Sequence, residues 1–320
     1  MTVRLTVDRA AWMAQVQTVA TSYGEGLVAV VKGNGYGFTR PVLHDAAVAN
    51  GARFVCVGTV HELVDVPADL TAVVLTPTLT APTDTRAVLT VGSVEHVQGL
   101  QGWPGSVIVK LASSMRRYGA TPTELAALLV AVEAANLSVM AFGLHLPLAG
   151  DDVARIDEIE QWLPALPAGS PLWVSHLSAE AFHRLAAIHP DREFRVRVGT
   201  TLWHGIPRAD FLRLTADVLQ THHVRAGEVA GYHHTPVPFD GTLVAIGAGA
   251  AHGMAPIEDV DPERRSPFHF QRQRMVLLER PHMHTTLTMV PVGQPCPRVG
   301  EWVDVQRPLI NTAVDELLWT

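Results

Sequence analysis

Short apolar runs alternate with longer amphipathic stretches over residues 27–198, and this alternation constrains the fold more than any other feature of the chain. Short apolar runs bounded by turn residues are typical of buried strands, and helical stretches between them require the strands to be parallel. Eight runs can be marked, at 27–32, 53–57, 71–75, 87–91, 105–111, 138–144, 171–175 and 193–198. This count predicts an α/β fold, an eight-stranded parallel β/α (TIM-type) barrel. A doubly wound open sheet would show the same alternation, and only the count favours the barrel.

Two of the intervening helices have clear boundaries in the sequence. Residues 121–135 begin with Thr121 and Thr123, which are suited to N-capping, and continue with leucines at helical spacing. Residues 151–163 carry Ile156, Ile159 and Trp162 on one helical face. We therefore expect helices over both ranges.

The pattern changes after residue 212. Short segments rich in β-branched residues follow one another, separated by Gly or Pro and without helical stretches between them, for example 241–246, 275–278, 285–290 and 301–305. We expect a barrel domain at 1–212, followed by a C-terminal mainly-β domain at 213–320. Residues 253–272 have turn-forming residues and little apolar periodicity, which predicts a long surface loop in that second domain.

The composition is that of an ordinary globular protein and excludes several classes of partner. A chain of 320 residues, 48% of them hydrophobic, can bury a full-sized core. The net charge of −7, without a basic cluster interleaved with aromatic residues, argues against nucleic acid and anionic membrane surfaces as partners. Cys56 and Cys296 lie far apart, which gives no support to a disulfide framework or a structural zinc site.

The cysteine usage also fits a reducing cytoplasm. Residues 1–10 mix charged and apolar side chains and lack the apolar core of a signal peptide, and no run is long enough to span a bilayer. The protein is therefore expected to be soluble, cytoplasmic and unprocessed.

Lys32 is the residue with the strongest functional signal. It ends the apolar run of the first predicted strand and begins the glycine-rich turn Lys32-Gly-Asn-Gly-Tyr-Gly. An amine that is partly removed from water at a strand end can act as a neutral nucleophile and as a covalent anchor. The alternative is an ordinary surface lysine whose apolar stem is covered before a strand-to-helix turn. Spacing alone favours this alternative.

The turn resembles the motif Lys-Ala-Asn-Ala-Tyr-Gly of the fold-type III pyridoxal-phosphate enzymes, the alanine racemase family. This resemblance implies that Lys32 binds the aldehyde of pyridoxal 5'-phosphate covalently and that Tyr36 contacts its phosphate. Two alanines of the motif are glycine here, at Gly33 and Gly35. We expect these glycines to loosen the turn without changing the chemistry.

Residues 110–119 resemble the family segment Lys-Val-Asp-Thr-Gly-Met-Gly-Arg-Leu-Gly. The resemblance places Arg117 on an arginine that grips the substrate carboxylate or supports a phenolic base, and a guanidinium is suited to either role. The aspartate of the family is Ala112 here, so this loop should be organised differently. Without the resemblance, Arg116 and Arg117 would be taken as a solvated surface pair.

Residues 194–205 resemble the family segment Val-Arg-Pro-Gly-Ile-Leu-Leu-Tyr-Gly. The match implies that Arg197 faces the pyridine nitrogen and that the amides of Gly199 and Thr200 meet the phosphate, as the start of a helix can. An arginine at the ring nitrogen disfavours its protonation, which weakens the electron sink and favours brief proton exchange at Cα. From the residues alone, Arg195 and Arg197 share one strand face and could both be exposed.

Residues 225–235 resemble the family segment Pro-Ala-Gly-Glu-x-Val-Gly-Tyr-Gly-x-Thr, which matches Tyr232 to its tyrosine. Racemisation requires two acid/base groups on opposite faces of Cα, and the resemblance assigns one to Lys32 and the other to Tyr232. In the family this tyrosine comes from the partner subunit, which implies a head-to-tail homodimer with shared active sites. The alternative is a hairpin tyrosine that fills a gap between strands.

Further matches are less specific. The histidine that stacks on the cofactor ring in the family falls at Pro147 here, and His145 is a candidate substitute two residues earlier on the same strand face. The resemblance also suggests Ser178 as a phosphate ligand and Met289 as the residue whose backbone amide meets the substrate carboxylate. The printed sequence ends at Thr320, before the family's late phosphate-binding tyrosine, so we expect fewer or different side chains around the phosphate.

The sixteen histidines show no metal-binding spacing, and we predict no metal site. Two pairs, His222–His223 and His233–His234, are expected on strand or loop surfaces.

Three functions remain open. The first is an amino-acid racemase with alanine-racemase architecture. The second is a decarboxylase or aldolase on the same scaffold, for which altered residues at Ala112, Pro147 and Thr200 would admit a different substrate. The third is a non-catalytic pyridoxal-phosphate carrier. Such carriers lack a C-terminal β domain, so residues 213–320 with Tyr232 count against this third function.

Overall fold

The chain divides into two compact units in a computed structural model that describes residues 2–205, 210–256 and 266–320. The first, which we call the barrel unit, comprises Met13–Gly35 and Arg40–Ile206. The second, the β unit, comprises Met1–Trp12, Tyr36–Thr39 and Pro207–Thr320. Each unit is described below by itself.

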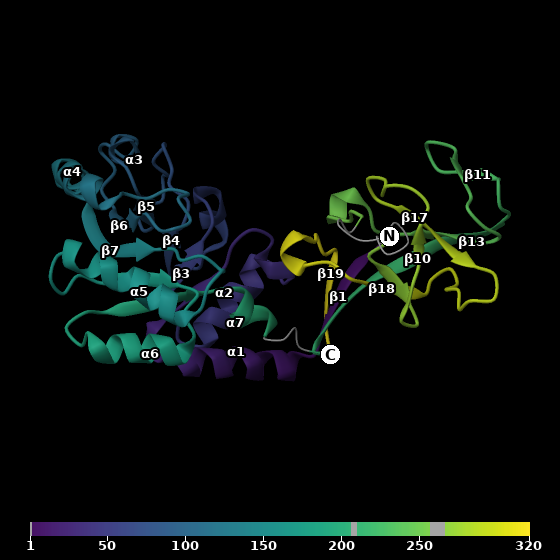
Figure 1. Cartoon of the computed structure of the whole chain (residues 1–320), viewed down its shortest axis with the longest axis horizontal. Coiled ribbons are helices and arrows are strands. Elements are labelled where there is room, and N and C mark those ends of the chain that lie inside the picture. Colours follow the sequence, from purple (N-terminus) through teal and green to yellow (C-terminus); the bar gives the residue numbers. More distant parts are fainter. Residues whose placement is uncertain (1, 206–209, 257–265) are drawn as a thin grey trace. The chain divides into compact units, whose positions relative to one another are not determined.

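Eight parallel strands close into a barrel in the barrel unit (Figure 1). They are β2 (Leu27–Val30), β3 (Phe54–Val57), β4 (Thr71–Val74), β5 (Val88–Val91), β6 (Ser106–Leu111), β7 (Ser138–Leu144), β8 (Leu172–Ser175) and β9 (Phe194–Val198). The pairing of β9 with β2 completes the ring. The predicted barrel is confirmed, and each of the eight predicted strands is present with its ends within two residues of the expected positions.

Helices lie between most of the barrel strands along the sequence, although the described residues between β4 and β5 contain none. They are α1 (Arg9–Tyr23), α2 (Arg40–Ala49), α3 (Val94–Gln98), α4 (Pro122–Ala134), α5 (Asp152–Trp162), α6 (Ala179–Ile188) and α7 (Thr200–His204), with the 3-10 helices η1 (Gly24–Gly26), η2 (Gly35–Gly37), η3 (Val60–Asp65) and η4 (Leu163–Ala165). Both helices with clear sequence boundaries are confirmed as α4 and α5. Asp151 caps α5 by accepting a hydrogen bond from the amide of Ala154 at 2.9 Å. None of the helices in the described residues is long and apolar enough to cross a membrane.

Large side chains from strands that are not neighbours meet inside the barrel. The rings of Phe54 in β3 and Trp173 in β8 lie 5.3 Å apart in an edge-on contact. The guanidinium of Arg195 in β9 lies 5.1 Å from the Phe54 ring. Because β3 is adjacent to neither β8 nor β9, these contacts cross the interior of the barrel. Arg195 therefore faces inward, and so does Arg197, because side chains two positions apart share a strand face.

Antiparallel strands dominate the β unit, which confirms the predicted mainly-β domain. A seven-strand path runs in the order β15-β14-β18-β10-β13-β17-β16, with β1 and β19 joined to it through β10. The strands are β1 (Val3–Val7), β10 (Leu212–Val224), β11 (Val229–Ala230), β12 (Thr235–Pro236), β13 (Gly241–Ile246), β14 (Phe268–Phe270), β15 (Gln273–Arg274), β16 (Val276–Leu277), β17 (Thr286–Pro291), β18 (Trp302–Val305) and β19 (Glu316–Trp319); the 3-10 helices are η5 (Ala250–His252) and η7 (Leu309–Asn311).

The predicted boundary at 1–212 and 213–320 is wrong at the N-terminus. Strand β1 pairs antiparallel with β10 and parallel with β19, so the first twelve residues group with the β unit. Val3, Leu5 and Val7 on one face of β1 are fully buried. The sequence did not reveal this because pairing partners more than 200 residues away leave no local pattern.

The predicted loop at 253–272 is also corrected. Residues 268–270 form β14, which pairs antiparallel with β18 and β15. Three residues are too few to display an alternating pattern, so the strand depends on its tertiary partners. Residues 257–265 of the predicted loop lie outside the described residues.

Candidate active site

Five polar side chains stand at or just after the C-terminal ends of barrel strands. Lys32 follows β2, Lys110 is the penultimate residue of β6, and Arg197 is the penultimate residue of β9; His145 follows β7 and His176 follows β8. The carboxyl ends of parallel barrel strands open at one face, where barrel enzymes place their active sites. We call this face the barrel mouth.

The backbone around Lys32 is held by charged side chains of the barrel unit. The amide of Gly33 donates to Glu62 Oε1 at 3.1 Å, and Arg40 Nη1 donates to the Gly33 carbonyl at 2.6 Å. Arg40 is itself paired with Asp65 at 2.6 Å. The turn that presents Lys32 is therefore fixed from both sides of the peptide.

Lys32 itself is exposed, whereas we expected its amine to be partly removed from water. The reason is that it lies two residues beyond the last residue of β2, where the chain has left the barrel wall. The glycine at position 35 is required: its φ is +65°, and an added Cβ would lie 2.4 Å from the Arg40 amide nitrogen. The glycines thus shape this turn, whereas we expected them to loosen it.

Tyr36 is buried and adopts a left-handed backbone conformation, with φ of 55°. This region is uncommon for residues other than glycine and often marks functional turns. Residues 36–39 group with the β unit, where Phe38 stacks on Trp12 with ring centroids 5.0 Å apart. The contact of Tyr36 with a phosphate stays a prediction.

Arg197 links the ends of neighbouring strands at the barrel mouth. Its Nη2 donates to the Leu144 carbonyl at 2.7 Å, and its Nε donates to the Val174 carbonyl at 3.2 Å. Desolvation lowers the pKa of Arg197 from its usual value. The alternative of two exposed arginines on β9 is wrong, since Arg195 and Arg197 both face inward. That Arg197 faces a pyridine nitrogen stays a prediction.

The start of α7 lies where the phosphate amides were predicted. Gly199 precedes the helix as its N-cap, and Thr200 is the first helical residue. The first amides of a helix have no partner within it, so they can donate to an anion. Trp203 Nε1 donates to the Val30 carbonyl at 2.8 Å, which holds α7 against the end of β2. Gly199 and Thr200 therefore remain candidates for phosphate binding.

Lys110 is a functional candidate that the sequence interpretation missed. It is 5% exposed, and its Nζ has no hydrogen-bond partner among the residues that the structure describes. Desolvation lowers its pKa well below the usual value, and the charges of Arg197 and Arg117 act in the same direction. The sequence contained a signal for Lys110. Only two of the 24 lysines and arginines are lysines, and both stand at or next to the last residue of a predicted barrel strand.

His145 and His176 form a pair of imidazoles with ring centroids 5.1 Å apart. Burial lowers the pKa of His145 to about 2, together with the charges of Arg197 and Lys110. Burial also lowers the pKa of His176, followed by the charges of Arg155 and Arg197. His176 was missed from the sequence, and its φ of 63° marks a strained position directly after β8.

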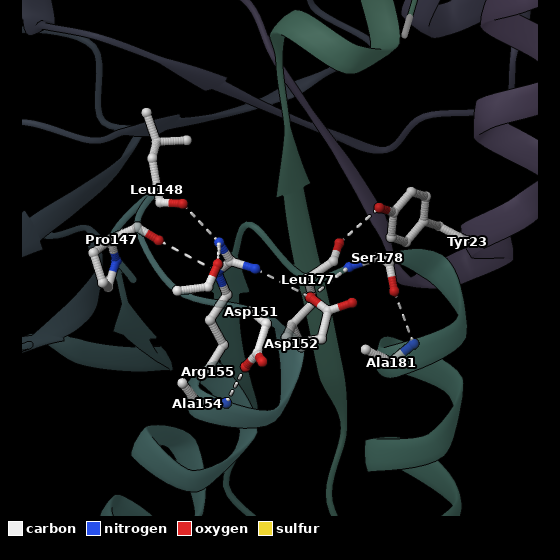
Figure 2. A network of polar contacts seen from close by, with 11 residues as sticks. Tyr23, Pro147, Leu148, Asp151, Asp152, Ala154, Arg155, Leu177, Ser178 and Ala181 are labelled. Carbon is white, nitrogen blue, oxygen red and sulfur yellow. Dashed lines mark hydrogen bonds and ion pairs between the residues drawn. The ribbon is translucent and has the colours of Figure 1, made fainter.

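Ser178 caps a helix in the structure, and its contact with a phosphate stays a prediction. Its hydroxyl caps α6 by accepting from the amide of Ala181 at 3.1 Å, and its own amide donates to Asp152 Oδ1 at 3.3 Å (Figure 2). Figure 2 also shows Arg155 donating to the carbonyls of Pro147 and Leu148, which fixes the loop after β7.

Arg117 lies in the loop that follows β6. It is exposed, and its guanidinium lies 4.6 Å from the centre of the Tyr118 ring. Its charge contributes to the lowered pKa values of Lys110 and His145. Substrate binding by Arg117 stays a prediction.

Tyr232 and Met289 belong to the β unit and differ in exposure. Tyr232 is 81% exposed, and its ring lies against that of His282 with centroids 4.1 Å apart. The alternative of a tyrosine that fills a gap between strands is therefore wrong. Met289 is fully buried in the middle of β17, between β13 and β16, with its side chain in the core. The contact of its amide with a substrate stays a prediction.

No group of three or more histidine, cysteine or acidic side chains that could hold a metal ion occurs among the described residues. The two histidine pairs are exposed, as expected. Both cysteines are free.

The electrostatics of the barrel mouth suit an anionic ligand. All the charged groups that act on the pKa values of His145, His176 and Lys110 are cationic. Within the described part of the chain, the Nζ of Lys110 is a buried donor without an acceptor. Pyridoxal phosphate carries a dianionic phosphate and an aldehyde that reacts with an amine. The cationic groups of the barrel mouth suit the phosphate, and the exposed amine of Lys32 suits the aldehyde, so the residues present fit this cofactor.

A closed eight-stranded barrel with a lysine after its first strand, joined to a mainly-β unit, defines the class of fold-type III pyridoxal-phosphate enzymes. The family described as "Alanine racemase, N-terminal domain" matches residues 7–207, and the chain therefore belongs to the alanine racemase family. No curated protein matches the chain.

Solved structures of alanine racemases share the whole fold. The enzyme from Bartonella henselae with covalently bound pyridoxal phosphate is 17% identical, with a TM-score of 0.75 over 100% of both chains. The enzyme from the D-cycloserine producer Streptomyces lavendulae is 16% identical, with a TM-score of 0.75 over 100% of this chain and 97% of the other. The Bacillus anthracis enzyme with bound L-Ala-P is 19% identical, with a TM-score of 0.74 over 95% and 85%. At these identities the likeness establishes the fold alone.

The lowered pKa of His145 predicts a defined acid sensitivity. The folded pKa of about 2 lies below the ordinary value of 6.5, so the unfolded chain binds more protons below pH 6.5. Stability is therefore lost as the pH falls below 6.5, by about 1 to 2 kcal/mol between pH 7 and pH 5. Urea unfolding of the cofactor-free protein should show a smaller loss for His145→Gln. The exposed His222→Gln is the control, and equal losses in the wild type and His145→Gln would contradict the prediction.

Proposed function

We propose that this chain is a pyridoxal-phosphate-dependent amino-acid racemase that exchanges the Cα proton with Lys32 and Tyr232. The observation that carries the proposal is an exposed lysine at the mouth of a barrel in which the charged groups that act on His145, His176 and Lys110 are cationic. Such a mouth favours an anionic cofactor and an anionic substrate. The family membership gives this arrangement its expected chemistry.

Several residues would hold the cofactor. Lys32 would bind its aldehyde and Arg197 would lie at its ring, while His145, Tyr36 and the amides at Gly199 and Thr200 would contact the ring or the phosphate. When bound, pyridoxal phosphate withdraws electrons from the Cα of an amino acid and makes its proton removable. Arg197 is suited to its position because two backbone carbonyls orient its guanidinium.

The remaining steps belong to side chains of this protein. Lys32 Nζ removes or returns the proton on one face of Cα, and the phenol of Tyr232 does so on the opposite face. Arg117 binds the substrate carboxylate, for which its exposed guanidinium is suited. Two bases on opposite faces make the reaction reversible between the L and D enantiomers.

We further propose that the active form is a head-to-tail homodimer in which each site receives Tyr232 from the partner subunit. The support is that Tyr232 projects from the β unit with most of its ring exposed. A side chain in this situation is available to a second chain. The free cysteines agree with a reducing cytoplasm as the compartment.

Incubation with L-amino acids in deuterium oxide tests the proposal. The protein loaded with pyridoxal phosphate should produce the D enantiomer with deuterium at Cα, and the same protein without cofactor should not. Release of carbon dioxide or of an aldehyde would instead indicate a decarboxylase or an aldolase. If none of the twenty amino acids is changed, the function that remains is that of a non-catalytic pyridoxal-phosphate carrier. A chiral product screen in the same experiment identifies the substrate.

A further inference from the structure

The turn that carries Tyr232 is built around one buried carboxylate. Glu279, whose side chain is 6% exposed, accepts a hydrogen bond from the Tyr232 amide at 3.0 Å through Oε1. Its Oε2 accepts from Thr235 Oγ1, also at 3.0 Å, and the His233 amide donates to the same carboxylate. Both ends of the turn between β11 and β12 are therefore tied to Glu279.

The glycine before Tyr232 allows this close approach. Gly231 has φ of +78°, and an added Cβ would lie 2.1 Å from Glu279 Oε1. Any other residue would displace the carboxylate from the amide of Tyr232. Gly231 and Glu279 thus form a matched pair within the β unit.

His282 joins the same carboxylate to the ring of Tyr232. Its Nε2 is hydrogen-bonded to Glu279 Oε1, and its ring lies against the Tyr232 ring with an interplanar angle of 33°. The backbone of His282 is fixed on both sides, because its amide donates to the Thr285 carbonyl and its carbonyl accepts from the Ala250 amide. The imidazole is therefore a rigid support for one face of the phenol ring.

The charge of Glu279 is maintained despite its burial. Desolvation by itself would raise the pKa of this carboxyl, but hydrogen bonds from His282, Thr235 and the backbone amides outweigh it and lower the pKa. A charged acceptor strengthens each of these hydrogen bonds.

A strongly exposed tyrosine would ordinarily sample several rotamers, and a proton-transfer group needs a fixed orientation. We propose that Glu279 and His282 are positioning residues that hold the phenol of Tyr232 in one orientation for proton transfer at Cα. This inference rests on the proposed racemase function. Glu279 fixes the backbone of the turn, and His282 fixes the ring.

Three variants separate these contributions. Glu279→Gln keeps the size of the side chain but replaces an acceptor oxygen by an amide nitrogen that faces hydrogen-bond donors. His282→Phe keeps an aromatic ring and loses the hydrogen bond to Glu279, whereas His282→Ala loses both. Matched controls in the β unit are Glu301→Gln and His222→Ala, which lie outside this cluster.

The first measurement is independent of activity. Nuclear magnetic resonance of protein with ring-labelled tyrosine gives four signals, one for each tyrosine, and Tyr232→Phe identifies that of Tyr232. Its shift should change in His282→Ala and Glu279→Gln and should stay unchanged in both controls. A Tyr232 signal that is the same in the wild type and in both variants overturns the proposal, whatever the activity.

The second measurement separates positioning from a general loss of structure. In His282→Ala and Glu279→Gln, kcat should fall on the order of 10-fold to 100-fold, because misplacement of a reacting group by about 1 Å has effects of this size. The KM should stay within about 2-fold, and His282→Phe should recover part of kcat. A changed signal with unchanged kcat would also overturn the proposal. An inactive wild type would refute the proposed function alone, and the resonance comparison would still decide whether Tyr232 is held.

Discussion

Replacing Lys32 by alanine should abolish covalent attachment of pyridoxal phosphate and reduce racemisation by on the order of 10⁴-fold or more, since an acid/base group alone contributes about 10² to 10⁴. The variant loses both the anchor for the aldehyde and the base on one face of Cα. Visible absorbance of the protein with added cofactor, followed by chiral product analysis, measures the two losses separately.

The chain offers an unusually clear chemical control for this experiment. Lys32 and Lys110 are its only lysines, so borohydride reduction and peptide mass mapping can give a pyridoxyl label at only two side chains. We expect the label on Lys32 in the wild type and on neither residue in Lys32→Ala. Lys32→Arg should fail equally, because it keeps the charge and removes the primary amine. A label on Lys110, or undiminished activity of either variant, would refute the assignment.

Tyr232→Phe should keep the bound cofactor and lose racemisation by about 10² to 10⁴, the range of a single acid/base group. The physical reason is that Lys32 still reaches one face of Cα while the opposite face has no proton donor. In deuterium oxide, one enantiomer should therefore continue to exchange its Cα proton without inversion, and the other should exchange far more slowly. Equal exchange and undiminished racemisation of both enantiomers would remove Tyr232 from the mechanism.

Mixing two inactive variants tests whether Tyr232 acts in the partner subunit. Random exchange between Lys32→Ala and Tyr232→Phe chains gives half mixed dimers, each with one intact site of two, so activity should return to about one quarter of the wild type. A tyrosine that acts within its own chain would leave every site incomplete. In that case mixing would restore nothing.

The barrel and the position of Lys32 could be predicted because both depend on local patterns. A buried strand in a parallel barrel is covered on both faces, so it is apolar throughout and stands out between helices. The end of β2 is then set by the change from Val31 to the glycine-rich turn. The N-terminal strand was placed in the wrong unit because β1 finds its partners, β10 and β19, at the far end of the chain.

The rest of the site depends on contacts between residues that are far apart in the sequence, and motif spacing does not reveal such contacts. No spacing in the sequence shows that Asp152 of α5 accepts a hydrogen bond from the Ser178 amide. The support of Tyr232 by His282 joins two turns of the β unit that lie 50 residues apart.

By itself the sequence determined the β/α alternation, the lysine at the first strand end and the motif that contains Tyr232, because each is encoded in a few consecutive residues. The tertiary structure decided three further features. They are the charges around the barrel mouth, the burial of Lys110 without a partner among the described residues, and the hydrogen bonds by which Glu279 holds the turn that carries Tyr232. Burial and electrostatic environment arise from residues that are distant along the chain and meet only after folding, so they are properties of the packed structure.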